Sequence, residues 1–266
     1  MRALVTGACG QIGSRCLDAL RGRAEVVGLD RRAPADVVHD LRTPLSPSAL
    51  EGVDAVLHLA GSREDVAFEP TAAWAAVEAN VVATANLLAA VPPSAHVVLV
   101  SSISAGAASA YGASKSAAEH VARLWTGRLT IARLAQVYGP GTDPRNGMYR
   151  MIAAARRGEA IVVDCRPDLR RDYIHVNDAA RLLVEILLGP SAGEINVGSG
   201  GGVAIGELAR LIAGLCGAPP PTLRADAPAG GRDYVLDTAA LAARGLGPAI
   251  GLADGVASEI ARLGAR

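Results

Sequence analysis

Thr6-Gly-Ala-Cys-Gly-Gln-Ile-Gly13 follows a short apolar run and leads into a helical pattern. Its glycines, Gly7, Gly10 and Gly13, stand at positions with distinct requirements. The first permits a tight turn, the second lets the backbone approach a pyrophosphate, and the third allows a helix to pack closely on a strand. The helix that follows would offer free N–H groups and the positive end of its dipole to phosphates. No Gly-Lys-Ser/Thr follows, which excludes a Walker loop. The segment therefore predicts a dinucleotide-binding turn.

Short apolar runs alternate with helical patterns over the first 135 residues. The runs expected to form strands are Ala3–Thr6, Glu25–Asp30, Val37–His39, Ala55–Leu59, Val97–Ser101 and Leu129–Leu134. Thr71–Ala90 is the clearest helix, since apolar residues recur there every three or four positions: Trp74, Val77, Val81, Ala85 and Leu88. This alternation predicts an α/β fold, a Rossmann-type doubly wound parallel sheet with helices on both faces.

The pattern changes after Leu134. Residues 139–147 are rich in Gly and Pro and predict a long loop, as do residues 217–231. Met148–Arg157 and Asp178–Leu188 are expected to be helices, and Ala160–Val163 a short strand. The tail is too short for an independent domain, so we expect a small, discontinuous substrate-binding cap over the carboxyl edge of the sheet. The expected division is 1–137 and 171–198 for the dinucleotide-binding domain, and 138–170 and 199–266 for the cap.

Asp30 ends the second predicted strand, 17 residues after Gly13. A carboxylate at this point accepts hydrogen bonds from a ribose with free hydroxyls and repels a 2′-phosphate, which favours NAD. Arg31 and Arg32 follow directly and would suit a 2′-phosphate, or simply form a solvated pair. NAD is the expected cofactor, with NADP as the alternative.

Tyr111-Gly-Ala-Ser-Lys115 places a phenol and an ammonium four residues apart, on one face of a helix. A tyrosine is a poor base near neutrality, but a nearby ammonium favours its phenolate form. The predicted strand before this helix ends in Ser101-Ser102. The Ser102 hydroxyl would donate to the substrate oxygen whose proton Tyr111 exchanges, and Ser104 is the alternative for this role. These residues predict acid–base catalysis beside a nicotinamide.

Further segments extend this pattern: Asp40-Leu41, His58-Leu-Ala-Gly61, Asn80–Leu88, Arg133–Pro140, Arg171–Asp178 and Asn196–Ser199. With them the sequence resembles the extended short-chain dehydrogenase/reductases of the NAD-dependent epimerase/dehydratase family, over nearly its whole length. The resemblance implies that Gln11 and Ile12 of the glycine turn contact the cofactor, with Asp40 and Leu41 beside the adenine. It also places Leu59, Ala60 and Gly61 along the adenosine half, and adds Asn80 to the cofactor site.

The segment Arg171–Val176 is especially similar to its counterpart in UDP-galactose 4-epimerases, in which the arginine contacts the diphosphate of the nucleotide. A guanidinium matches phosphate oxygens in a bidentate way; the alternative for Arg171 is an ion pair with Asp168 or Asp172. Gln136 stands where the family often has an asparagine facing the substrate. His175 is expected to be buried and structural.

The resemblance implies reversible hydride transfer on a nucleotide sugar, and Arg171–Val176 favours a nucleotide-sugar 4-epimerase. A 4-ketoreductase or a sugar or uronate dehydrogenase would use the same groups. Ser102 and Tyr111 are only nine positions apart, which indicates a shortened substrate loop. Ile103-Ser104 replaces the Asp-Glu pair of the family's dehydratases, which argues against 4,6-dehydration. A non-catalytic NAD(P)-binding regulatory protein would be expected to lack Tyr111 or Lys115.

The composition argues against other classes of protein. The 26 lysine and arginine residues balance the 26 acidic ones, so nothing favours nucleic acid or an anionic membrane as a partner. Four widely spaced cysteines form no CxxC pair, predict no metal site and suit a reducing, cytoplasmic location. Neither a signal peptide nor a membrane span is expected. The resemblance also implies a homodimer that pairs through the helix that carries Tyr111 and the helix before it. The first of these would supply apolar side chains, unless they face the core: Ala117, Val121, Leu124 and Trp125.

Overall fold

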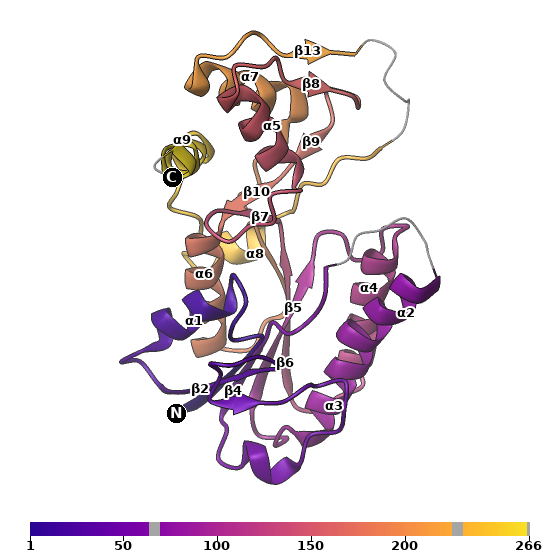
Figure 1. The fold of residues 1–266 in the computed structure, drawn as a ribbon. Coiled ribbons are helices and arrows are strands. Elements are labelled where there is room, and N and C mark those ends of the chain that lie inside the picture. The colour runs from indigo at the N-terminus through magenta and orange to yellow at the C-terminus, as the bar shows by residue number, and fades with distance from the viewer. Residues whose placement is uncertain (64–69, 225–230, 265–266) are drawn as a thin grey trace. The chain divides into compact units, whose positions relative to one another are not determined.

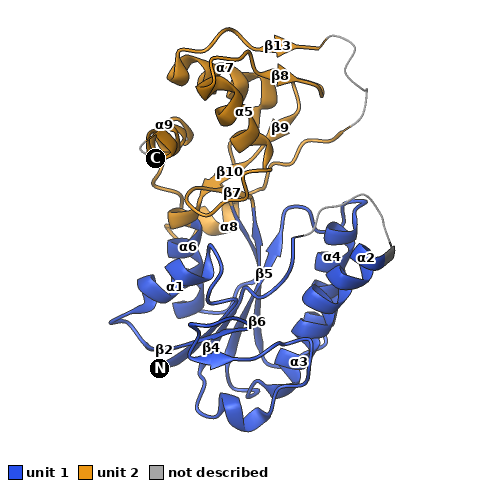
Figure 2. Ribbon diagram, in the orientation of Figure 1, with its two compact units in different colours: residues 1–134, 179–197 blue, residues 135–178, 198–266 orange. Residues whose placement is uncertain are grey.

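The computed structural model describes residues 1–63, 70–224 and 231–264. The chain forms two compact units, shown in Figure 2: unit 1 comprises residues 1–134 and 179–197, and unit 2 comprises residues 135–178 and 198–266. Each unit has its own hydrophobic core.

The described residues of unit 1 form a parallel sheet with helices on both faces (Figure 1). The strands are β1 (Arg2–Thr6), β2 (Glu25–Asp30), β3 (Val37–Val38), β4 (Ala55–His58), β5 (His96–Ser102), β6 (Arg128–Leu134) and β11 (Gly193–Val197). They run across the seven-stranded sheet in the order β11-β6-β5-β4-β1-β2-β3. The order reverses between β1 and β4, and open α/β sheets bind ligands beyond the strand ends at such a switch point. The predicted fold is confirmed.

Helices cover both faces of this sheet. α1 (Gly13–Leu20) and α6 (Val176–Leu188) lie on one face, whereas α4 (Ala110–Arg123) and the helical residues 70–90 lie on the other (Figure 1). A short 3-10 helix, η1 (Pro47–Leu50), precedes β4. The core between the sheet and the second helical layer contains Leu4, Leu29, Val56, Leu87, Val97, Leu99 and Ile131. Burial on both faces explains the apolar run of β5, as is usual for parallel strands.

The helix predicted at Thr71–Ala90 is present, with a π-helical segment inside it. α2 (Pro70–Val77) continues into the π segment η2 (Glu78–Val82) and then into α3 (Ala83–Ala90). The predicted apolar stripe is wrong in part, because Trp74 is 61% exposed and Ala85 is exposed. The buried positions are Ala76, Asn80, Ala83, Thr84, Leu87, Leu88 and Ala90. A π segment adds a residue to the helical turn and so shifts which positions face the sheet.

By length and composition alone, Thr71–Ala90 is a helix that could cross a membrane. Its Leu87 and Leu88, however, belong to the hydrophobic core of unit 1. A single helix of this kind is weak evidence of a membrane span.

Unit 2 consists of small two-stranded sheets and helices. The strands are β7 (Gln136–Tyr138), β8 (Val162–Val163), β9 (Arg170–Arg171), β10 (Tyr173–His175), β12 (Val203–Ala204) and β13 (Thr222–Leu223). The helices are α5 (Gly147–Arg156), α7 (Ile205–Cys216), α8 (Ala239–Ala242) and α9 (Leu252–Gly264). The predictions of a helix at Met148–Arg157, of a loop before it and of a helix at Asp178–Leu188 are confirmed. The predicted loop at 217–231 contains the short β13, and its residues 225–230 lie outside the described residues.

A buried carboxylate holds the strands and loops of unit 2 together. Asp172 is fully buried and accepts hydrogen bonds from the Ser199 N–H at 2.8 Å and the Ser199 hydroxyl at 2.5 Å. The N–H groups of Gly200 and Leu236 also donate to it, at 3.2 and 3.3 Å. A buried carboxylate is stable only when donors replace its lost water, so these four contacts fix the segments that meet at Asp172.

The layered core of unit 1 predicts a sharp contrast between two valines. Val56 in the central strand β4 is fully buried, whereas Val38 in the edge strand β3 is 60% exposed. Val56→Ala should lower the free energy of unfolding by about 1.5–3 kcal/mol, because it removes buried methyl groups and leaves a cavity. Val38→Ala should change it by less than about 0.5 kcal/mol. Chemical denaturation of both variants measures this, and equal effects would contradict the described layering.

Candidate active site

The glycine turn packs against the end of a neighbouring strand so closely that side chains are excluded. Gly7 has φ +68°, and a Cβ there would lie 2.8 Å from the Ala60 nitrogen. A Cβ on Gly13 would lie 2.1 Å from the Gly7 carbonyl oxygen, and one on Gly10 would lie 3.0 Å from it. Gln11 and Ile12 complete the turn, and α1 begins at Gly13. The predicted turn between strand and helix is therefore present, with its glycines required by backbone contacts.

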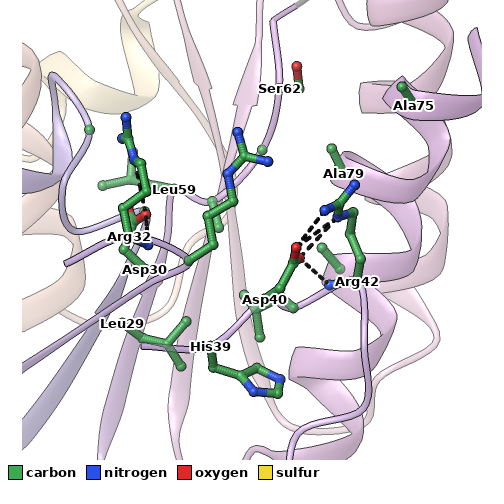
Figure 3. Close-up of a pocket in the computed structure, with 17 residues that line it drawn as sticks. Leu29, Asp30, Arg32, His39, Asp40, Arg42, Leu59, Ser62, Ala75 and Ala79 are labelled. Atoms are coloured by element: carbon green, nitrogen blue, oxygen red, sulfur yellow. Dashed lines mark hydrogen bonds and ion pairs between the residues drawn. The ribbon is translucent and has the colours of Figure 1, made fainter. Parts of the chain in front are cut away.

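A pocket of about 360 Å³ opens beside this turn, lined entirely by unit 1 (Figure 3). It brings together many of the predicted cofactor residues: Gly7, Gly10, Asp30, Arg31, Asp40, Leu41, Leu59, Ala60 and Gly61. Gln11, Ile12, Gly13 and Asn80 do not line it, nor do Tyr111 and Lys115, which are also expected to contact the cofactor. The sequence does not predict other residues of its wall, which are Leu29, His39, Arg42, Ser62, Ala75, Ala79 and Ala83.

Asp30 presents a carboxylate at the end of β2 that is already oriented by the backbone. It is 7% exposed and accepts hydrogen bonds from the N–H groups of Cys9 at 3.0 Å and Arg32 at 3.1 Å. The Arg32 side chain lies against it, with Nε 3.5 Å from Oδ1 (Figure 3). Arg31 lines the same pocket. The wall thus carries both the carboxylate that suits free ribose hydroxyls and the guanidinium groups that would suit a phosphate.

Arg42 is held over the same pocket by a two-pronged contact with Asp40 (Figure 3). Its Nη2 lies 2.6 Å from Asp40 Oδ2, and its Nε lies 3.0 Å from the same oxygen. Hydrogen bonding from Arg42 lowers the pKa of Asp40 to about 2, so the carboxylate stays ionised. The local signal is an Asp-x-Arg spacing, which also forms the fork between Asp143 and Arg145. Because that spacing occurs away from this pocket too, it does not by itself mark a site.

Tyr111 and Lys115 both lie on α4, one turn apart, and α4 packs on β5 and β6. Ser109 begins the helix, and its hydroxyl accepts from the Gly112 N–H at 3.1 Å. Lys115 is 8% exposed and donates from Nζ to the Val100 carbonyl of β5 at 2.7 Å. Ser102 ends the same strand, half-buried, and its hydroxyl oxygen accepts from the Ser104 N–H at 3.1 Å. The structure therefore fastens the helix of Tyr111 to the strand of Ser102 through the ammonium.

Lys115 is the only lysine among the 26 lysine and arginine residues of the chain. Burial lowers the pKa of its ammonium to about 8, and the negative charge of Glu119 opposes that shift. Arginine stays protonated at any ordinary pH, whereas a buried lysine readily changes its pKa. The cation with the lowered pKa therefore lies one helical turn from the predicted catalytic tyrosine.

Asn80 does not line the pocket but ties its wall to α4. Its carboxamide oxygen accepts from the Ser62 N–H at 3.1 Å. Its Nδ2 donates to the Ser62 carbonyl at 3.0 Å and to the Ser114 hydroxyl at 2.9 Å. Asn80 is 2% exposed, so its place in the structure is that of a buried link.

Gln136 and Arg171 both belong to unit 2. Gln136 begins β7, and Arg171 ends β9. Arg171 donates to the carbonyls of Arg170 and Arg232, both at 2.9 Å, and its guanidinium lies 5.0 Å from the centre of the Tyr234 ring. The guanidinium of Arg232 lies 4.7 Å from the same ring. Two cations therefore gather on one tyrosine.

The alternative of an ion pair between Arg171 and Asp168 or Asp172 is not observed among the described residues. Asp168 pairs with Arg166, and Asp172 is occupied by Ser199 and neighbouring N–H groups. The sequence gives no signal for Arg232, since its partner Tyr234 lies more than 60 positions from Arg171. His175 is 6% exposed and packs edge-on against Tyr138, as expected of a buried residue.

Because Lys115 is the only lysine, lysine-labelled protein gives one side-chain NMR signal whose titration reports this site. We expect a midpoint near pH 8. The unfolded chain holds the proton until about pH 10.4, so between these values it binds more protons than the folded protein. The free energy of unfolding should therefore rise with pH across this window, relative to Lys115→Met, by roughly 2–4 kcal/mol. A midpoint above pH 10 would contradict the buried, weakly paired ammonium.

Comparison with known proteins agrees with this geometry. A profile of the NAD dependent epimerase/dehydratase family matches residues 3–198. The dTDP-L-rhamnose 4-epimerase of Burkholderia thailandensis is 37% identical over 123 residues, which cover 42% of this chain and only 34% of that protein. The dTDP-4-dehydro-6-deoxy-D-allose reductase of Streptomyces bikiniensis is 29% identical over 265 residues and 81% of each chain. The solved structure of MoeE5 in complex with UDP-glucose and NAD is 28% identical, with a TM-score of 0.84 over 100% of both chains. The chain is therefore an enzyme of the NAD-dependent epimerase/dehydratase family.

Proposed function

We propose that the protein is a nucleotide-sugar 4-epimerase that uses tightly held NAD. The observation that carries the proposal is the Lys115 ammonium, buried and fixed 2.7 Å from the Val100 carbonyl, one helical turn from the Tyr111 phenol. A phenol that can exchange a proton and a cation with a lowered pKa, one helical turn apart, are the groups that this chemistry needs. The end of β5 supplies the Ser102 hydroxyl.

The residues present fit NAD. The glycine turn leaves no room for a Cβ at Gly7 or Gly13, so no side chain from these positions covers the start of α1, where a helix N-terminus favours a pyrophosphate. The adjoining pocket of about 360 Å³ offers Asp30 to a ribose with free hydroxyls. Asp30 repels a 2′-phosphate, and Arg31 is the group that would permit NADP. When bound, NAD supplies reversible hydride transfer with a sugar carbinol carbon.

Side chains of the protein transfer the proton of the sugar hydroxyl. Tyr111 takes the hydroxyl proton as the sugar is oxidised and returns it on reduction, while Ser102 donates a hydrogen bond to the developing oxyanion. The Lys115 ammonium favours the phenolate of Tyr111 through its charge. Because burial lowers the pKa of Lys115 to about 8, this charge is present at neutral pH and is lost at alkaline pH.

Arg171 and Arg232 would bind the diphosphate of the substrate. Their two guanidinium groups share the ring of Tyr234, at 5.0 and 4.7 Å, and the carbonyl of Arg232 accepts from Arg171. The face of the Tyr234 ring attracts both cations, and a bound anion would offset the repulsion between their charges. Gln136 would face the sugar. That relatives act on dTDP-sugars, and that MoeE5 has been solved with UDP-glucose, supports this substrate class.

A 4-ketoreductase is the second candidate. The reductase relative is similar over 81% of this chain, twice the share covered by the epimerase. Both reactions use the same tyrosine, lysine and serine. They differ in the cofactor, because an epimerase regenerates it within each cycle and a reductase consumes it.

A homodimer in the cytoplasm is also part of the proposal. Leu124, directly after α4, is 82% exposed and Trp74 on α2 is 61% exposed, and α4 and α2 pack together. Ala117 is exposed, Val121 is half-buried, and Trp125 packs against the core of unit 1. The exposed apolar side chains therefore support the dimer, whereas Trp125 packs against the core and is not counted among them. All four cysteines are free thiols, which suits a reducing compartment.

The central test compares two tyrosines. Tyr111→Phe should lower kcat for 4-epimerisation by about 10²–10⁴-fold while leaving NAD affinity nearly unchanged, because only the proton-transferring hydroxyl is lost. Tyr138→Phe is the matched control, since the Tyr138 hydroxyl is buried without a hydrogen-bond partner among the described residues. The assay uses a panel of UDP- and dTDP-sugars with no added cofactor, after dialysis.

Full activity of Tyr111→Phe would remove the catalytic assignment. Conversion that requires added NADH or NADPH, with loss of reduced nicotinamide absorbance, would replace the epimerase with the ketoreductase.

The second test concerns the adenosine pocket. The Arg42 guanidinium, oriented by Asp40, lines this pocket and is expected to lie against the adenine ring. Arg42→Met keeps an apolar stem but loses the cation, and should raise the NAD dissociation constant about two- to fivefold. Arg145→Met removes the same kind of fork with Asp143 outside the pocket. Calorimetry should show weaker binding only for Arg42→Met, and equal affinities for the two variants would contradict the assignment.

A further inference from the structure

His58 is a buried histidine with a hydroxyl partner on each ring nitrogen. It ends β4 and is 2% exposed. Thr6 Oγ1 lies 2.7 Å from Nδ1, and Thr84 Oγ1 lies 3.0 Å from Nε2. Burial lowers the pKa of the ring to about 3, and the Lys115 ammonium acts in the same direction. The imidazole is therefore neutral near physiological pH, and only one of its nitrogens carries a proton.

The partners of Thr84 decide which nitrogen that is. Thr84 Oγ1 lies 2.6 Å from the Asn80 carbonyl oxygen, which can only accept. The single hydroxyl proton of Thr84 is used there, so its oxygen accepts from His58 Nε2–H. The unprotonated Nδ1 then accepts from the Thr6 hydroxyl.

The same direction continues beyond Thr6. Thr6 Oγ1 accepts from the Ala60 N–H at 3.1 Å. The hydrogen bonds thus run one way, from Ala60 through Thr6, His58 and Thr84 to the Asn80 carbonyl. Each donor in the chain has one acceptor and each oxygen or nitrogen has a defined role, so reversing any member would leave a buried group unsatisfied.

The first end of this chain lies at the cofactor groove. Ala60 lines the pocket, and its backbone nitrogen is the atom that a Cβ on Gly7 would approach to 2.8 Å. The Ala60 N–H is turned toward Thr6, away from competition with a ligand. His58 therefore acts on the wall of the groove through Thr6.

The other end lies at the helix that carries Tyr111. Asn80 belongs to the π segment η2, in which the Ala83 N–H donates to the Glu78 carbonyl five residues back. The Asn80 side chain donates to the Ser114 hydroxyl, and Ser114 donates to the Tyr111 carbonyl at 2.8 Å. π segments frequently occur at functional sites. The Thr84 hydroxyl contributes a hydrogen bond to this irregular turn that the backbone alone would not supply.

We propose that His58 is a positioning residue whose Nε2–H tautomer joins the glycine-turn groove to the π segment of Asn80, and through Ser114 to the turn of α4 that bears Tyr111. The inference rests on the proposed roles of the groove and of Tyr111. It assigns a purpose to a buried histidine that takes no part in the chemistry.

The tautomer is tested directly on the wild-type protein. Nitrogen-15 NMR should show the His58 ring as the neutral Nε2–H tautomer, unchanged from pH 8 to pH 5, with the signal assigned by its absence from His58→Leu. An Nδ1–H tautomer, or protonation of His58 above pH 5, would overturn the proposal. Should His58→Leu fail to fold, through-space contacts from the ring to the methyl groups of Thr6 and Thr84 assign the signal in the wild-type protein instead.

The role of this series of hydrogen bonds is tested with a matched pair of histidines. His96 is also 2% exposed, and its Nε2 lies 2.9 Å from the Thr130 hydroxyl. It begins β5, however, and so lies at the amino ends of the parallel strands, whereas His58 lies at the carboxyl end of β4. His58→Leu should raise the NAD dissociation constant about tenfold and shift the single lysine NMR signal. His96→Leu should leave both within about twofold, although each variant lowers the melting temperature. If either fails to fold, Thr84→Val and Thr130→Val give the same comparison with smaller side-chain changes.

The outcomes separate this inference from the proposed function. Wild-type protein that binds NAD, with equal effects of the His58 and His96 variants, would overturn the inference alone. Wild-type protein that binds neither NAD nor NADP would overturn the proposed cofactor use and the inference with it.

Discussion

The close approach of the glycine turn to the end of β4 is the constraint on which the site depends. A Cβ at Gly13 would lie 2.1 Å from the Gly7 carbonyl, and one at Gly7 would lie 2.8 Å from the Ala60 nitrogen. Such distances leave backbone against backbone, with no side chain to fill the space at the switch point of the sheet. The pocket beside the turn stays open at the carboxyl ends of β1 and β4 because these positions are glycine. Asp30, at the end of the neighbouring strand β2, also lines this pocket.

The sequence predicts the parts of the fold whose signals are local. Strand–helix alternation identifies β1 to β6, because buried parallel strands are short apolar runs between helices. It does not identify β11, where Glu194 is exposed and Ile195 buried, since an edge strand lacks the continuous apolar run. It predicts β8 (Val162–Val163) within the expected strand Ala160–Val163, but not the other two- and three-residue strands of unit 2, whose pairing partners are distant in sequence. The π segment at Glu78–Val82 likewise depends on Asn80 reaching Ser62, a tertiary contact without a local pattern.

The candidate site divides in the same way. Glycine spacing, a carboxylate at a strand end and a Tyr-x-x-x-Lys helix are local patterns, and the structure brings Gly7, Asp30 and Asp40 into one pocket. Arg42 is missed because its Asp-x-Arg fork also occurs at Asp143–Arg145, away from this pocket. Arg232 is missed because only the fold places it and Arg171 on Tyr234. Long-range contacts of this kind leave no local pattern in the sequence, whereas the motifs do.

The charged groups around α4 influence one another, and among them Lys115 has a pKa that is lowered to about 8. Burial would raise the pKa of Glu119, but hydrogen bonds from Arg133 and Ser101 outweigh it and keep the carboxylate ionised. Arg133 reaches Glu119 at 2.6 and 2.8 Å and cannot itself lose its proton. Glu119 in turn opposes the loss of the proton from Lys115, one turn away on the same helix. The permanently charged arginine thus fixes the carboxylate, and the carboxylate moderates the lysine. An arginine in place of Lys115 would keep its charge at every pH, so the single lysine of the chain stands where a lowered pKa is possible.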